Sequence, residues 1–335
     1  MDHKTNTTLL FAFSFFIMYL ITIASTKDLC NPTDKNTLLK IKKSLNNPYH
    51  LASWDPESDC CSWYSLECGD ATVNHRVISL TIFSGQISGQ IPLEVGDLPY
   101  LQELMFHKIT NITGQIPHTI TKLKYLRSLR LSWLNLTGPV PEFLSQLMNL
   151  DYLNLSFNKL SGSIPSSLSL LPKLSYVDLS RNKLTGTIPE SFGSFPAELP
   201  YLILSHNQLS GSIPKSLGNV DFNQIDFSRN KLTGDASMLF GAKKTMFSID
   251  LSRNMFQFDL TRVEISKSFG VLDLNHNGIT GSIPVQWTEH SLQILNVSYN
   301  RLCGRIPTGG SLQRFDSYTY FHNKCLCGAP LDSCK

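Results

Sequence analysis

The chain has 335 residues, of which 41% are hydrophobic and 16% are charged, and its formal net charge at pH 7 is +3. A chain this apolar can bury a core, so the composition excludes an intrinsically disordered polymer. The net charge is too small for a general nucleic-acid binder, whose surface carries a clustered basic stripe.

The first predicted element is a leader. Residues 9–24 are mostly apolar and carry no charge, and Lys4 precedes them. This run is shorter than the roughly 20 residues that a membrane-spanning helix needs, so the pattern predicts a secretory signal peptide over residues 1–26. No second apolar run of that length follows. We therefore expect a secreted, soluble protein without a membrane anchor.

A cysteine-rich cap is predicted at each end of the mature chain, over residues 27–76 and 308–335. An even number of cysteines in a secreted chain predicts disulfides, and pairing within two groups of four leaves nine arrangements. Adjacent Cys60 and Cys61 are badly placed to bond one another, which favours sequential pairing. The favoured pairs are Cys30 with Cys60, Cys61 with Cys68, Cys303 with Cys325, and Cys327 with Cys334.

Zinc is the alternative reading of the first cysteine group. Cys60, Cys61, Cys68 and a histidine could hold the ion, but the C-x-x-C spacing typical of structural zinc is absent and the expected compartment is oxidising. We therefore expect no metal, and nothing in the sequence predicts a cofactor.

The region between the caps, residues 77–307, is a repeat. The tetrad Gly-x-Ile/Val-Pro recurs every 23 to 25 residues, and Gly234 keeps the glycine but lacks the proline. The interval from Gly234 to Gly281 is 47 residues, so one degenerate copy, with Phe258 at the glycine position, lies between them. This makes ten repeats. The full tetrads begin at Gly89, Gly114, Gly138, Gly162, Gly186, Gly211, Gly281 and Gly304.

Each tetrad follows the pattern L-x-L-x-x-N-x-L, as from Leu153 to Leu160. Two leucines spaced by two point to the same side of an extended strand, so the leucines face a core and the residues around them face solvent. Short units stacked in this way predict an α/β solenoid, a right-handed superhelix of about ten 24-residue repeats closed by the two caps.

The asparagine of the pattern predicts a structural ladder rather than a series of active sites. A buried amide survives only where its donors and acceptors are satisfied, and stacked turn backbones can satisfy it repeat after repeat. The ladder comprises Asn158, Asn182, Asn207, Asn230, Asn254, Asn277 and Asn300, whereas the first three repeats carry Gly85, Thr110 and Leu134 there.

Three segments resemble a known family. They are the cap DLCNPTDKNTLLKIKKSLNNPYHLASWDPESDCCSWY, the stretch GDASMLFG, and the tail RLCGRIPTGGSLQRFDSYTYFHNKCLCGAPLDSCK. Together with the ten repeats they resemble the plant polygalacturonase-inhibiting proteins, which are extracellular leucine-rich-repeat proteins, over essentially the whole mature chain. The resemblance implies a monomeric cell-wall defence protein of the apoplast that binds fungal endopolygalacturonases on its concave sheet and blocks pectin cleavage. Pectin itself is a further partner that the mildly basic charge would suit.

The solvent-facing strand positions are the candidate partner-binding residues. Tyrosines are favoured interface anchors, while carboxylates add polarity and steering. We predict partner contacts from His107, Arg130, Tyr152, Tyr176, Asp178, Tyr201, Gln224, Asp226, Asp250 and Asp273. The family resemblance implies that an acidic position such as Asp226 grips basic residues around the enzyme's cleft.

Four N-x-S/T sequons lie in the mature chain. Asn111 and Asn135 follow the ladder position, beside the sheet, and we expect glycans there. Asn154 and Asn296 lie on the concave strands, where a glycan would obstruct the binding face, so we expect these two to be unoccupied.

Catalysis is not expected. Asp226 and Asp250, on neighbouring strands, could imitate a glycosidase pair, but an inner face open to water is expected to leave their pKa values unshifted. Two further non-catalytic functions remain open. One is a receptor-like module for a peptide or oligosaccharide. The other is ice binding, which would require a regular array of small polar residues.

Overall fold

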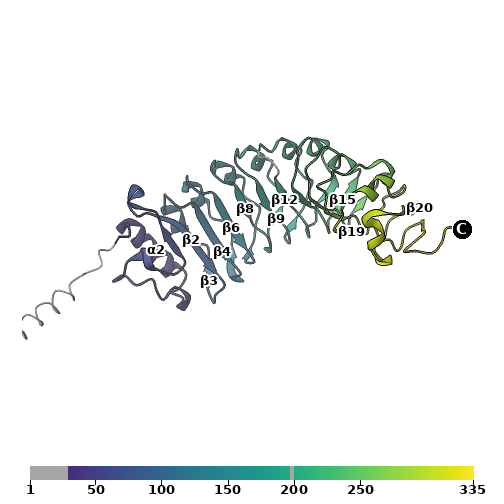
Figure 1. Ribbon diagram of the computed structural model, residues 1–335. Helices are drawn as coiled ribbons and strands as arrows, with labels where there is room; N and C mark the ends of the chain where they lie inside the picture. The colour runs from purple at the N-terminus through teal and green to yellow at the C-terminus, as the bar shows by residue number, and fades with distance from the viewer. Residues whose placement is uncertain (1–28, 197–199) are drawn as a thin grey trace, which may run out of the picture.

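The protein is a curved arch of stacked coils (Figure 1) in a computed structural model that describes residues 29–196 and 200–335. The predicted signal peptide lies outside the described residues. Within them, no helix is long and apolar enough to cross a membrane. The N-terminal cap forms one end of the arch and the C-terminal cap the other.

One long sheet runs through all the coils. It has 11 strands, of which β1 is antiparallel to β2 and the other ten are parallel to one another, one for each predicted repeat. In order they are β1 (Leu66–Cys68), β2 (Val77–Phe83), β4 (Glu103–His107), β6 (Ser128–Ser132), β8 (Tyr152–Asn154), β10 (Tyr176–Asp178), β12 (Tyr201–Ile203), β14 (Gln224–Asp226), β16 (Ser248–Asp250), β18 (Val271–Asp273) and β19 (Ile294–Asn296).

Side chains along each strand point alternately to the core and to solvent, as the leucine spacing predicts. Leu153 and Leu155 are fully buried, and Leu153 pairs in register with Val177 of the next repeat. Because every repeat places its apolar pair at the same height, the buried side chains form a single continuous core along the arch. The residues on either side of each leucine consequently form straight columns on the concave face.

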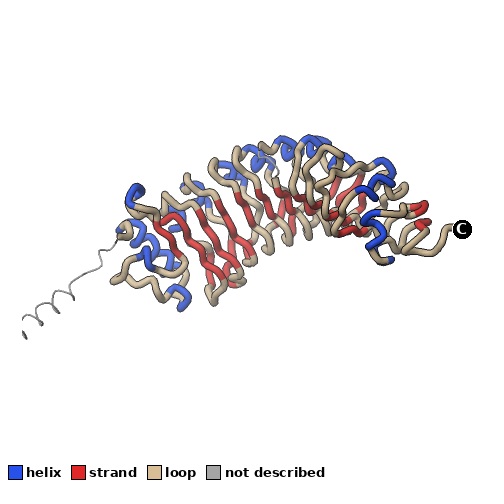
Figure 2. Tube along the Cα trace, in the orientation of Figure 1, coloured by secondary structure: helices blue, strands red, loops and turns tan. Residues whose placement is uncertain are grey.

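Short 3-10 helices cover the opposite, convex side (Figure 2). Most of them begin directly after the proline of the tetrad, whose fixed φ suits a helix start. They are η4 (Leu93–Asp97), η5 (His118–Lys122), η6 (Glu142–Gln146), η7 (Ser166–Leu170), η8 (Glu190–Ser194), η9 (Lys215–Asn219), η10 (Ser237–Leu239), η11 (Leu260–Arg262), η12 (Val285–Glu289) and η13 (Gly310–Arg314).

Small parallel sheets lie on the side of the arch, between the concave strands and the helices. Their strands are β3 (Ser88–Gln90), β5 (Asn111–Gly114), β7 (Asn135–Leu136), β9 (Ser161–Gly162), β11 (Lys183–Leu184), β13 (Ser210–Ser212), β15 (Lys231–Gly234), β17 (Met255–Phe256), β20 (Cys303–Arg305) and β21 (Cys325–Cys327). The tetrad glycines adopt positive φ here, for example 78° at Gly186, which explains why the repeat requires glycine.

The asparagine ladder is present and longer than the sequence pattern indicates. Asn323, in the C-terminal cap, accepts from the backbone N–H of Leu302 at 3.0 Å, as the repeat asparagines accept from the preceding coil, and it donates to two carbonyls where each of them donates to three. The cap therefore continues the geometry of the repeats. One assignment is wrong: Ile109, not Thr110, occupies the ladder position of the second repeat, because an extra residue lies between Phe106 and Ile112.

The N-terminal cap packs α2 (Pro32–Ser44) and the short helices η1 (Tyr49–Leu51), η2 (Cys60–Ser62) and η3 (Ala71–Val73) against the first coil. Its central polar contact joins the buried Asp34 carboxylate to Arg76, which donates two hydrogen bonds at 2.7 and 2.9 Å. Trp54 and Trp63 stack beside it with centroids 5.7 Å apart.

The C-terminal cap covers the free edge of β19. The segment around η14 (Ser317–Thr319) accepts two backbone hydrogen bonds from the strand side, Val297 to Thr319 and Tyr299 to Phe321. In both caps the disulfides have the sequential pairing favoured from the sequence: Cys30–Cys60, Cys61–Cys68, Cys303–Cys325 and Cys327–Cys334.

Candidate functional site

The concave face carries the predicted tyrosine column. Tyr152, Tyr176 and Tyr201 open three consecutive strands in register. The rings of Tyr152 and Tyr176 stack with centroids 4.3 Å apart, and Tyr176 and Tyr201 follow at 5.7 Å. All three side chains are half-buried, so each offers one apolar surface of its ring to a partner. The neighbouring rings already fix the rotamer of each tyrosine, which lowers the entropy lost on binding. Gln224 extends the column by one strand.

A second column, the middle column, consists of the residue that lies between the two core-facing apolar positions of each repeat, as Asn154 lies between Leu153 and Leu155. Asp226, Asp250 and Asp273 occupy it on three neighbouring strands, and Asp178 lies two strands before Asp226. Each carboxylate accepts the backbone N–H two residues further on, as Asp226 does from Ser228 at 3.0 Å. This hydrogen bond holds the strand end in the conformation that leads into the turn.

The same hydrogen bond does not require a charge. Asn154 accepts from the N–H and hydroxyl of Ser156 at 3.0 and 2.7 Å, the distances found between Asp226 and Ser228. Asn296 does the same at the other end of the column. An amide oxygen thus makes the same structural hydrogen bond as a carboxylate oxygen. The negative charge of the four carboxylates is therefore not needed for the fold.

Three of these charges, those of Asp178, Asp250 and Asp273, are costly where they lie. Burial, together with the neighbouring Asp226 and Asp273, raises the pKa of Asp250 to about 6. Burial also raises the pKa values of Asp178 and Asp273. For Asp250 the expectation of an unshifted carboxylate on an open face is therefore wrong, because burial in the middle column desolvates it.

Two other predicted residues, His107 and Arg130, lie nearer the N-terminus. His107 is only 5% exposed, lies under the ring of Phe83 and is hydrogen-bonded to Ser132 at 2.7 Å. Burial lowers its pKa to about 4, so it is neutral at physiological pH. His107 therefore stabilises its strand and presents little surface to a partner. Asp178, at 8% exposed, also presents little surface, whereas Arg130 is half-buried and presents more.

A third column was missed from the sequence. It is formed by the residue that precedes each ladder position, where the chain leaves the concave face with φ near +55°, and we call it the turn column. From the second coil onward it comprises Lys108, Trp133, Phe157, Arg181, His206, Arg229, Arg253, His276, Tyr299 and His322. Its regular place before the asparagine could have revealed it.

The turn column is cationic and aromatic. Trp133 and Phe157 stack at 3.6 Å, and the guanidinium of Arg181 lies 4.8 Å from the Phe157 ring centroid. Tyr299 stacks between His276 and His322 at 4.1 and 4.2 Å. Within the described ranges, the two ion pairs found involve none of these arginines. Arginine charge is thus free on one edge of the face while carboxylate charge lies along its middle.

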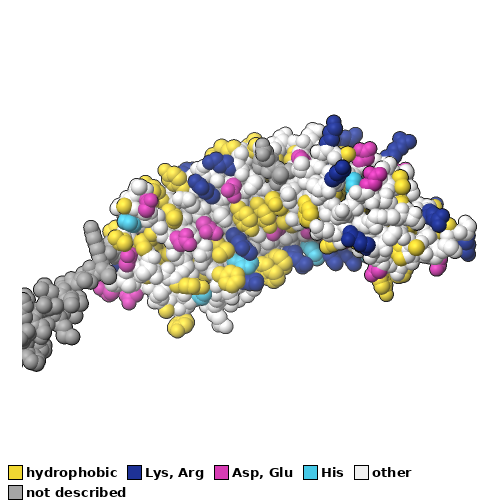
Figure 3. Space-filling model, in the orientation of Figure 1, with side chains coloured by type: hydrophobic (Ala, Val, Ile, Leu, Met, Phe, Trp, Pro, Cys, Tyr) yellow, Lys and Arg dark blue, Asp and Glu magenta, His cyan; other side chains and the backbone are white. Residues whose placement is uncertain are grey.

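A hollow of about 460 Å³ lies between these two columns. It is lined by Asp226, Asp250 and Asp273 on one side, Arg181, Arg229 and Arg253 on the other, and mainly serines between them. Figure 3 shows hydrophobic side chains gathered near the middle of the arch and cationic side chains along its lower edge. The tyrosine column thus lies on β8, β10 and β12, and the carboxylates of the hollow lie on the following strands β14, β16 and β18.

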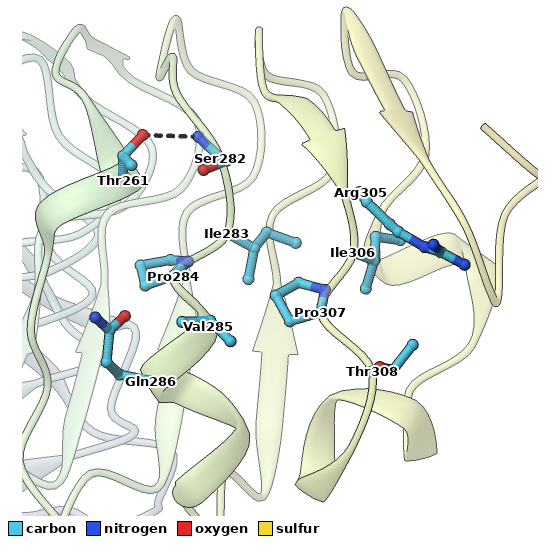
Figure 4. A pocket seen from close by; sticks show the side chains of 10 residues that line it. All are labelled: Thr261, Ser282, Ile283, Pro284, Val285, Gln286, Arg305, Ile306, Pro307 and Thr308. Carbon is cyan, nitrogen blue, oxygen red and sulfur yellow. Dashed lines mark hydrogen bonds between the residues drawn. The ribbon is translucent and has the colours of Figure 1, made fainter. Parts of the chain in front are cut away.

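Another hollow, of about 620 Å³, lies away from the concave face, between the Ile-Pro turns of the last two repeats (Figure 4). Ile283, Pro284, Ile306 and Pro307 form its walls, and Arg305 points away from its centre. It contains none of the predicted partner-binding residues.

The four sequon asparagines differ in accessibility. Asn111 is exposed and Asn135 is half-buried, both on the lateral strands. Asn154 is 5% exposed, and its amide is occupied by Ser156 and by the Tyr152 hydroxyl. Asn296 is held by Ser298 in the same way. That only the lateral pair is glycosylated stays a prediction.

Comparison with known proteins agrees with this architecture. Residues 31–69 match the family model described as leucine rich repeat N-terminal domain, and residues 148–209 match a leucine rich repeat model. The chain is 75% identical to polygalacturonase inhibitor 1 of Arabidopsis thaliana over 335 residues, which is 100% of both chains. It is 61% identical to the polygalacturonase inhibitor of Vitis vinifera, covering 99% of this chain and 100% of that one.

A solved structure of a plant ice-binding protein has the same fold. Its TM-score is 0.89 at 52% sequence identity, and the match covers 92% of this chain and 99% of that chain.

Proposed function

Because the chain belongs to the leucine-rich-repeat family of plant polygalacturonase inhibitors, we propose that it is secreted into the cell wall, binds fungal endopolygalacturonases on its concave face, and blocks pectin cleavage by covering the enzyme's cleft. The observation that carries this proposal is the set of surplus carboxylates in the middle column. Since Asn154 and Asn296 perform the structural task without charge, the burial cost at Asp250 is offset only if a partner uses the charge.

The tyrosine column supplies the apolar part of such an interface. Tyrosine is enriched among the residues that dominate binding energy, and stacked rings lose little side-chain entropy when a partner binds. Tyr176 shares its strand with Asp178, and Tyr201 lies on the strand next to that of Asp226. A convex partner with basic groups around an apolar centre would match this pattern.

We propose that the protein acts by binding rather than by catalysis, and as a monomer. The raised pKa of Asp250 alone would permit acid catalysis. However, in each carboxylate of the middle column one oxygen is already held by a backbone N–H, and the whole-chain relatives are inhibitors. The monomer is supported by the caps, because β1 and η14 close the row of ten parallel strands at its two ends.

The test is inhibition of a panel of purified fungal endopolygalacturonases, measured as reducing ends released from polygalacturonate. The secreted, disulfide-bonded protein should inhibit at least one enzyme at a stoichiometric ratio, and a stable complex should appear on size-exclusion chromatography. If no enzyme of a broad panel is bound or inhibited, the proposal is wrong.

Pectin is a second candidate ligand, favoured by the arginines of the turn column, which form no ion pair with any described residue. Arg181, Arg229 and Arg253 lie along one edge of the face, and such a row would attract a polyuronate chain in a salt-dependent way. Retention on immobilised polygalacturonate that falls steeply with salt, and falls further in Arg229→Gln, would support it. Retention that is equal in that variant would contradict it.

Ice binding is a second candidate of another kind, favoured by the ice-binding relative. On the lateral face Ser161, Ser163, Thr185 and Thr187 are exposed hydroxyl residues in adjacent repeats. A measurement of thermal hysteresis and ice recrystallisation decides this directly, because a protein without ice affinity leaves both unchanged.

A further inference from the structure

Trp133 is an exposed indole with one free face. It follows β6 directly in the left-handed backbone region, with φ of 56°, and is 40% exposed. Phe157 of the next repeat covers one face of the indole at 3.6 Å and 14°. Among the described residues no second ring or cation stacks on the other face, which is turned toward the preceding repeat. An apolar ring is thus held rigidly with a surface in water.

A sequon asparagine lies two residues further on. Leu134 and Leu136 are buried, whereas Trp133 is exposed and Asn135 is half-buried, so the side chains on either side of Leu134 both reach solvent. The Asn135 amide donates to the carbonyl of Thr110 in the preceding repeat, at 2.5 Å. The side chain therefore leans toward the same neighbour as the free face of the indole.

We propose that Asn135 carries an N-linked glycan whose first N-acetylglucosamine ring packs on the free face of Trp133. The inference rests on secretion, which is part of the proposed function. Pyranose rings have an apolar face of C–H groups, and placing it on an indole removes both surfaces from water. The site is thus a modification site with a built platform for the sugar.

The chemistry of attachment is compatible with the contact to Thr110. Transfer from a lipid-linked diphosphate oligosaccharide breaks the bond between the sugar C1 and the phosphate oxygen and forms a bond between C1 and Asn135 Nδ2, which loses one proton. The diphosphate lipid leaves and takes up that proton in the overall balance. The second hydrogen of Nδ2 remains, so the bond to the Thr110 carbonyl can persist and orient the glycan.

The preceding repeat contains a matched control. Asn111 is followed by Thr113, whose hydroxyl donates to the carbonyl of Gly89 at 3.2 Å, and Thr137 makes the same bond to Gly114 at 3.3 Å. The two sequons differ in the residue two positions earlier, which is the fully buried Ile109 before Asn111. A glycan on Asn111 would therefore have no aromatic platform.

A sugar held on Trp133 would restrict the concave face at one edge only. Trp133 belongs to the turn column, whereas Tyr152 opens its strand on the opposite edge. The glycan would narrow the approach over the first three repeats and leave the tyrosine and carboxylate columns open.

The experiment uses full-length protein secreted by a eukaryotic host that makes high-mannose glycans, trimmed enzymatically to a single N-acetylglucosamine. Mass spectrometry of glycopeptides reports occupancy of Asn135. Thermal melts are then compared across a double-mutant cycle of wild type, Asn135→Gln, Trp133→Ala and the double variant. We expect the single sugar to raise the Tm by about 2 °C or more when Trp133 is present and by nothing measurable in Trp133→Ala.

Asn111→Gln, made in the same two backgrounds, should show no coupling to Trp133. Trp133→Phe should retain part of the effect, because a phenyl ring still offers a stacking face. An unoccupied Asn135, or a Tm gain that is the same with and without Trp133, would overturn the proposal. Inhibition is not measured in this experiment, so either failure leaves the proposed inhibitor function standing.

Discussion

Leu209 donates its backbone N–H to the side-chain oxygen of Asn230, which lies one repeat further along the arch, at 3.0 Å. The amide nitrogen of Asn230 donates to three carbonyls, those of Leu204, Phe227 and Ser228, at 3.0 to 3.2 Å. One side chain thus joins two coils, and each repeat asparagine does the same for its own pair.

Replacing this residue by leucine should therefore destabilise the stack. Asn230→Leu leaves the Leu209 N–H and the carbonyl of Leu204 without their partner in a region that water cannot easily enter. We expect a loss of at least about 2 kcal/mol in the free energy of unfolding. Chemical denaturation monitored by circular dichroism measures it. Unchanged stability would mean that the ladder is not what holds the turns.

The charge of the middle column is tested at Asp226. Asp226→Asn removes the charge and keeps an oxygen for the N–H of Ser228, as Asn154 does for Ser156. We expect roughly tenfold weaker inhibition, equivalent to about 1.4 kcal/mol, with an unchanged melting temperature.

Asp226→Lys should weaken inhibition further, because it adds repulsion against a basic partner. It also loses the acceptor for Ser228, so a modest drop in melting temperature is expected, smaller than that of Asn230→Leu. Inhibition constants and melts of the three variants check this order. The reverse order of melts would contradict the assignment of Asp226 to the open face.

Asp250 predicts a pH dependence of stability. Its pKa is raised in the folded protein from 3.8 to about 6, so between these values the folded state binds more protons than the unfolded state. Stability contributed by this group is fully present below pH 3.8 and is lost as pH rises through about 6.

Asp250→Asn should consequently be more stable than wild type at pH 7, by on the order of 1 to 2 kcal/mol, and equal to it near pH 3.5. Urea denaturation at several pH values measures the difference. An advantage that does not vary with pH would show that the charge is not the source of the cost.

The N-terminal cap depends on the contact between Arg76 and Asp34. Asp34 is fully buried and accepts from the Arg76 side chain and from the Val77 N–H. Arg76→Met keeps most of the volume but leaves a buried carboxylate without its cation. We expect a loss of about 3 to 5 kcal/mol. Lys122→Met is the control, because its pair with Asp97 is exposed and should contribute little.

Several features could be predicted because they depend on local spacing. The L-x-L alternation predicts which residues enter the core, and Leu153 and Leu155 are buried accordingly. The ladder residue of the second repeat was assigned wrongly because this repeat has one extra residue between the ladder position and the tetrad glycine. Counting back from the glycine and counting forward from the strand therefore give different residues. Thr110 fits when counted back from the tetrad glycine, but Ile109 follows the positive φ of Lys108 and is buried.

The properties of the charged part of the candidate site could not be predicted from the sequence. The sequence places Asp226, Asp250 and Asp273 on one face but does not show the burial that raises the pKa values of Asp250 and Asp273. Nor does it show that Phe83 covers His107, since that contact joins neighbouring coils.

The sequence by itself determined the period, the number of coils, the inward face of each strand and the grouping of cysteines into two caps, because each of these follows from backbone geometry over a few residues. Only the tertiary structure decided which outward residues stay in water and what their charges cost. The turn column shows the reason most directly: Trp133, Phe157 and Arg181 are about 24 residues apart in sequence, and they stack only because the coils close at the same height.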